Sequence, residues 1–70
     1  MNDIEEAIAL AKSILEDIEE LPEVAEDFAA SVGEKAASII EWIEEHDHVT
    51  DGQIMALENM RDGIDRWLHL

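Results

Sequence analysis

The feature that most constrains the fold is the spacing of the apolar residues, which recur every three or four positions along the chain. In the first third they are Ile4, Ala7 or Ile8, Ala11, Ile14 or Leu15, Ile18 and Leu21. This spacing places them on one face of an α-helix, and no alternating pattern typical of a β-strand competes with it. Two residue pairs fit the polar pattern that starts a helix, Asn2 with Glu5 and Asp3 with Glu6. Because Pro22 disfavours helical geometry in the residue before it, the first helix is expected over about 3–20.

A second apolar face follows the proline and comprises Val24, Ala25, Phe28, Val32, Ala36, Ile39, Ile40 and Ile43. It predicts a helix over about 23–46. The segment Ser31-Val32-Gly33-Glu34 matches the S-x-x-E pattern of a helix N-terminus, so a break or kink is expected near Ser31. The alternative is one continuous helix, because serine and glycine weaken a helix without forbidding it.

A third helix is expected over about 51–68, because Thr50-Asp51-Gly52-Gln53 forms a second capping pattern directly ahead of an apolar run. Its inward residues are predicted to be Ile54, Leu57, Met60 or Arg61, Ile64, and Trp67 or Leu68. A smaller stripe of Ala56, Met60 and Gly63 would let a neighbouring helix approach closely, which would justify a glycine inside a helix. The sequence therefore predicts an all-α fold, a small antiparallel bundle of three helices, or of four pieces if the chain breaks near Ser31.

The chain has 70 residues and no cysteine, so we expect one helical domain over residues 1–70 without a disulfide or a thiolate metal site. A domain of this size is marginally stable on its own, which favours association with itself or with a partner. No apolar stretch approaches the ~20 residues that span a bilayer, and the segment MNDIEEAI lacks a basic signal-peptide region. These features predict a soluble, cytoplasmic protein without membrane partners.

Two histidines flank Asp47 between the second and third predicted helices, and they raise the question of a metal site. Other potential ligands nearby or at the chain end are Glu45, Asp51 and His69. The H-x-H spacing of His46 and His48 differs from the helical H-E-x-x-H motif, so it is a weak metal signal. An ordinary helix corner is favoured, with His46 at the negative end of a helix dipole and Val49 packing on Ile54. No metal or other cofactor is predicted.

Catalysis is not expected. The hydroxyl side chains are Ser13, Ser31, Ser38 and Thr50, and two of them already match helix caps. The chain has no glycine-rich phosphate loop, and a bundle of ~70 residues offers little room for a concave substrate pocket. The sequence therefore predicts a protein that is not an enzyme.

The charge balance is strongly acidic, with 19 Asp and Glu residues against 4 Lys and Arg and a formal net charge of −15. This sign excludes direct binding to nucleic acid. One interpretation is a solvated surface that serves solubility or salt adaptation. The other is a surface that docks on a basic site of a nucleic-acid-handling protein, because carboxylates on neighbouring helical turns lie ~5–6 Å apart and loosely imitate phosphates. The residues predicted for such docking are Glu16, Asp17, Glu19, Glu20, Glu23, Glu26, Asp27, Glu41, Glu44 and Glu45.

A compact, cysteine-free, strongly acidic helical chain of this size resembles the small inhibitors that phages and prophages encode against host nucleic-acid machinery. The segment VTDGQIMALENMRDGIDRWL is similar to helices of short phage proteins. Anti-CRISPR and anti-restriction DNA mimics are the types in question. The resemblance implies a stoichiometric inhibitor whose acids occupy a channel lined by arginine and lysine. It assigns no role to any single residue.

A self-associating dimerisation or adaptor module is the alternative function, and it rests on two large apolar residues at the edge of the predicted core. Trp42 adjoins the stripe of the second helix, and Met55 adjoins Ile54 in the third. In an antiparallel hairpin these two residues would come close together. If exposed they would form an interface of a homodimer, since tryptophan and methionine are enriched at interfaces. Trp67 is expected in the core, facing Phe28.

Overall fold

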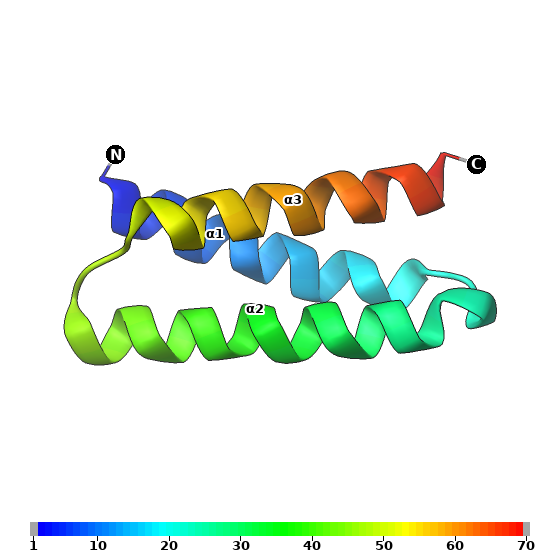
Figure 1. Ribbon diagram of the computed structural model, residues 1–70, viewed down its shortest axis with the longest axis horizontal. Helices are drawn as coiled ribbons and strands as arrows, with labels where there is room; N and C mark the ends of the chain where they lie inside the picture. Colours follow the sequence, from blue (N-terminus) through cyan, green and yellow to red (C-terminus); the bar gives the residue numbers. More distant parts are fainter. Residues whose placement is uncertain (1, 70) are drawn as a thin grey trace.

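The computed structural model describes residues 2–69, which form three α-helices, two short 3-10 helices and no β-strand. In chain order these are α1 (Asp3–Asp17), η1 (Ile18–Glu20), η2 (Glu23–Ala25), α2 (Glu26–His46) and α3 (Asp51–Leu68). Successive helices are antiparallel, so that α1 and α3 run in one direction along the bundle and α2 runs in the other (Figure 1). The bundle measures 36 × 19 × 18 Å. The predicted all-α antiparallel three-helix bundle is confirmed.

Local polar contacts explain where α1 begins and ends. The side chain of Asn2 caps the helix, because its Oδ1 accepts a hydrogen bond from the Glu5 backbone N–H at 2.8 Å. The first of the two predicted starts is thus the observed one. The α-helix ends at Asp17 and tightens into the 3-10 turn η1, three residues before the predicted end. Leu21 is extended, as expected for a residue before proline.

The predicted break near Ser31 is wrong, because α2 is continuous from Glu26 to His46. Ser31 is exposed in the middle of the helix, and the buried residues Val32 and Ala36 continue the apolar face past it. The presence of glycine at position 33 is explained by a close contact with Ile18 and not by the start of a helix. A Cβ atom placed on Gly33 would lie 2.9 Å from Cδ1 of Ile18, so the missing side chain lets η1 pack on α2.

The predicted bounds and capping box of α3 are confirmed. Thr50 Oγ1 accepts a hydrogen bond from the Gln53 N–H at 3.1 Å, and Gln53 Oε1 accepts one from the Thr50 N–H at 2.9 Å. Gly63 also has a packing reason, as predicted. A Cβ atom there would lie 2.8 Å from Cζ of Phe28, so the glycine accommodates an aromatic ring of α2.

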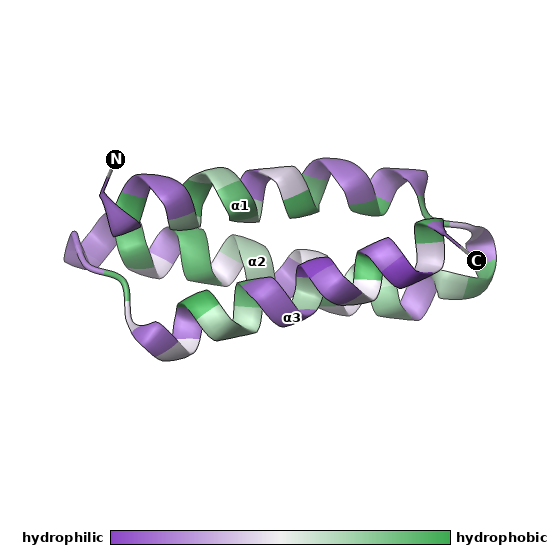
Figure 2. Ribbon diagram, turned by 90° about the horizontal axis from the view of Figure 1, so that it is seen from above, coloured by the Kyte–Doolittle hydropathy of each residue, from purple (hydrophilic) through white to green (hydrophobic). Residues whose placement is uncertain are grey.

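The core is one apolar cluster between the three helices, made of Ala7, Ala11, Ile14, Val32, Ala36, Ile43, Leu57 and Ile64. Hydrophobic segments of the helices face one another around it (Figure 2). Three of its members are alanines on α1 and α2, which allow these two helices to pack closely. Trp67 is half-buried and Leu68 is exposed, and Trp67, which was expected in the core, is not part of this cluster.

Candidate functional site

The acidic side chains cover the outside of the bundle, but the fold divides the predicted docking residues between its two ends. Those near the connection of α1 and α2 are named here the turn acids: Glu16, Glu19, Glu20, Glu23, Glu26 and Asp27. Those in the last two turns of α2 are named the corner acids: Glu41, Glu44 and Glu45. All nine are exposed. Because α2 runs the full length of the bundle, the two groups lie near opposite ends of it (Figure 1).

Few of these acids are neutralised by ion pairs within residues 2–69. In residues 2–69 the only ion pairs are those of Arg61 with Asp17 and with Asp65. These two aspartates are also the only acidic residues in that range that are partly buried. The turn acids and the corner acids are therefore exposed to solvent, and no cation in the described part of the chain pairs with them.

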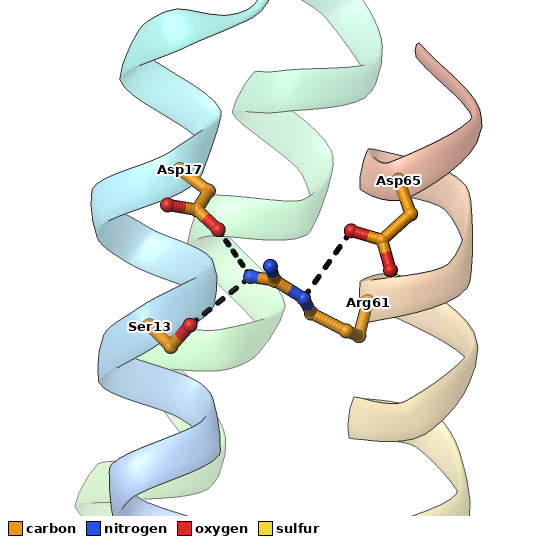
Figure 3. A network of polar contacts seen from close by, with 4 residues as sticks. All are labelled: Ser13, Asp17, Arg61 and Asp65. Atoms are coloured by element: carbon orange, nitrogen blue, oxygen red, sulfur yellow. Dashed lines mark hydrogen bonds and ion pairs between the residues drawn. The ribbon is translucent and has the colours of Figure 1, made fainter. Parts of the chain in front are cut away.

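Asp17 was predicted in the docking set, and the structure places it in a polar network between α1 and α3 (Figure 3). The Arg61 guanidinium donates hydrogen bonds from Nη1 to Asp17 and, at 3.0 Å, to Ser13 Oγ. Its Nε lies 3.4 Å from a carboxylate oxygen of Asp65, four residues later in α3. The network connects two helices, so Asp17 is less free than the turn acids to bind a partner. The sequence offered one signal for it, since Arg61 is the only basic residue at a predicted inward position.

The segment around the two histidines is a helix corner, as predicted. Asp47 ends α2 in the left-handed conformation with φ 50°, and its N–H donates to the Ile43 carbonyl at 2.8 Å. Nδ1 of His46 lies 2.8 Å from the Trp42 carbonyl oxygen, and the two rings stack with centroids 4.1 Å apart. Within the part of the chain that the structure describes, no three His, Asp or Glu side chains gather as metal ligands would.

The two apolar residues of the alternative interface have different surroundings. Trp42 is half-buried, packs against the core and is stacked on His46. Met55 is 63% exposed on α3. Trp67 lies beside Phe28 with ring centroids 6.5 Å apart, which confirms the pairing expected for it.

A groove with a largely apolar lining lies between α2 and α3. It forms because α1 packs closely on both other helices, whereas α2 and α3 contact each other at few points. One half of this α2–α3 groove is about 490 Å³ and the other about 390 Å³. Both halves are lined by Ser31, Lys35, Ala56 and Met60. The groove was not predicted from the sequence, although Ala56 and Met60 of the predicted small stripe lie along its α3 side.

No family model, curated protein or solved structure matches the chain. None of the helices in the described range is both long enough and apolar enough to cross a membrane.

Proposed function

We propose that the protein is a non-enzymatic inhibitor that uses its acidic surface to occupy the basic nucleic-acid-binding site of a partner protein. The observation that carries this proposal is the exposure of the turn acids and corner acids without internal cations. A chain with net charge −15 that served only its own stability would gain from pairing these carboxylates. Their exposure leaves them available to arginine and lysine side chains of another protein.

The placement of the acids suits a channel that normally holds a polyanion. Asp27 and Glu44 are separated by 17 residues of continuous helix, which is about 25 Å at a rise of ~1.5 Å per residue. The two acidic ends thus present charge at both ends of this length of the bundle. Charge of one sign also attracts a basic partner at long range and speeds encounter, an effect that falls as salt rises.

The test uses affinity capture from a cell extract, with and without nuclease, followed by two charge-reversal variants of equal size. The first variant is Glu16→Lys, Glu19→Lys and Glu20→Lys in the turn acids. The second is Glu41→Lys, Glu44→Lys and Glu45→Lys in the corner acids. Asp17 is left intact because its network with Arg61 supports the fold. Circular dichroism reports whether each variant keeps the helicity of the parent.

A nuclease-resistant complex with a basic protein is expected, and the variant of the turn acids should lose it while remaining helical. The variant of the corner acids shows whether both ends of the bundle are needed for binding the basic protein. Capture that is the same for the parent and both variants would reject the acidic surface as the docking site.

Self-association is the second candidate function, and the 63% exposure of Met55 favours it. The net charge of −15 opposes it, because two copies repel each other. Sedimentation equilibrium over a range of protein concentrations decides the matter. A monomer at the highest concentration would exclude the homodimer.

A further inference from the structure

The α2–α3 groove has the shape and the lining of a site for a helix. Its apolar lining includes Phe28, Val32, Ile39 and Met60, and its small residues are Ser31, Ser38 and Ala56. Small side chains at these positions leave room for the side chains of another element, and the larger ones offer apolar area to cover. An amphipathic helix that lays its apolar face into such a groove is a recurring mode of recognition.

The two walls of the groove differ in charge. On the α3 side, the groove is lined by Ala56, Asn59 and Met60, none of which is charged. On the α2 side, Asp27, Glu34, Glu41 and Glu45 follow one another at intervals of seven, seven and four residues, all exposed. Intervals of this size bring residues to the same face of a helix, so these four acids form a rim along α2. Glu34 lines the groove itself.

We propose that this groove binds a basic amphipathic helix of the partner protein, with apolar residues toward Met60 and cationic residues toward the acidic rim of α2. The inference rests on the proposed function, which requires a basic partner, and names the element of that partner that is recognised. A second copy of this chain fits less well, because it would bring a net charge of −15 to the rim. Lys35 is the one cation among the residues lining the groove, and an apolar residue of the bound helix packs on its aliphatic stem.

The length of the rim sets the length of the ligand. Asp27 and Glu45 are 18 residues apart on one continuous helix, or about 27 Å. The probe is therefore a fluorescein-labelled peptide of ~18 residues, with leucine at helical spacing and lysine at the remaining positions. A peptide of the same composition in scrambled order, without an apolar face, is the control for attraction by charge alone. Fluorescence anisotropy measures both affinities.

Two pairs of variants locate the binding. Ser31→Phe fills the groove from an exposed position on α2, and Ala37→Phe adds the same ring to an exposed position of α2 outside the groove lining. Glu34→Gln with Glu41→Gln removes two charges from the rim, and Glu16→Gln with Glu19→Gln removes two from the turn acids. Ser38→Phe, also exposed and lining the groove, replaces Ser31→Phe if that variant loses helicity.

The amphipathic peptide should bind at least about tenfold more tightly than the scrambled peptide, because only the former buries apolar area in the groove. Ser31→Phe should weaken its binding by about tenfold or more, and Ala37→Phe should leave it unchanged. Glu34→Gln with Glu41→Gln should weaken binding of the amphipathic peptide more than Glu16→Gln with Glu19→Gln does.

Equal affinity of the parent for both peptides, or unchanged binding by helical Ser31→Phe, would overturn the proposal. A parent dimer that Ser31→Phe converts to a monomer would show that a second copy fills the groove, which also overturns it. If the peptide fails while reversal of the turn acids still abolishes capture of the basic partner, the groove is rejected and the proposed function stands.

Discussion

The ion pair of Arg61 with Asp17 is the one that joins two helices in the described part of the chain. Its contribution to the free energy of unfolding can therefore be predicted. The perturbation is a double-mutant cycle with Arg61→Met and Asp17→Asn, which keep similar shapes and remove the charges. The side chains are 31% and 27% exposed. The contribution of this pair to the free energy of unfolding should thus lie between two ranges. Exposed ion pairs contribute ~0.2–1 kcal/mol, and hydrogen bonds to charged groups contribute ~1.5–3 kcal/mol.

We therefore expect a coupling energy of about 1 kcal/mol between Arg61 and Asp17. Arg61 and Asp65 provide the internal comparison, because they lie 3.4 Å apart within one helix and Asp65 is 47% exposed. Such pairs contribute only ~0.3–0.5 kcal/mol. A chain of 70 residues has a total stability of roughly 4–10 kcal/mol, so the loss of 1 kcal/mol is measurable and lowers Tm by ~4–8 °C.

Urea denaturation followed by far-ultraviolet circular dichroism gives the free energy of unfolding for each member of both cycles. The expected order is a larger coupling for Asp17 than for Asp65. Equal couplings, or none for Asp17, would refute the assignment of the network as a connection between α1 and α3.

The remaining predictions concern the free energy of unfolding and use the same urea measurement. Gly52→Ala should stabilise the protein by up to ~1 kcal/mol, because the nearest atom to the new Cβ is Thr50 Oγ1 at 3.9 Å. Gly63→Ala should destabilise it, since overpacking against the Phe28 ring costs ~1–3 kcal/mol; a gain equal to that of Gly52→Ala would contradict the packing. Thr50→Ala should cost ~1 kcal/mol through loss of the helix cap, and no loss would mean that the cap is unimportant. Leu57→Ala should cost ~2–5 kcal/mol as a fully buried residue, whereas the exposed Met55→Ala should stay within ~0.5 kcal/mol.

Helix ends were predictable from the sequence wherever a side chain near the end decides them. The cap of Thr50 with Gln53 and the cap of Asn2 with Glu5 are contacts between residues three positions apart. The same kind of local pattern failed at Ser31, where packing overrides it. Nothing near Ser31 in sequence shows that Gly33 is needed for the contact with Ile18, which is a contact between α2 and η1.

The acidic character of the candidate site followed from composition, but its arrangement did not. That the turn acids and corner acids occupy opposite ends depends on α2 being unbroken. The pairing that makes Asp17 less available to a partner depends on Arg61, 44 residues later in the chain. The α2–α3 groove depends on how far α2 and α3 lie apart, which is decided by packing of both helices on α1.

Apart from Asp17 and Asp65, the acids of residues 2–69 are exposed without an ion pair, and we propose that a cationic partner binds them. The most direct measurement is Tm as sodium chloride is raised to ~1 M, where the screening length falls to ~3 Å. We expect Tm to rise by several degrees, and to rise less in the variant Glu16→Gln, Glu19→Gln and Glu20→Gln, because less repulsion remains to be screened. A Tm of the parent protein that is independent of salt would show that the exposed acids do not destabilise the folded chain by repulsion.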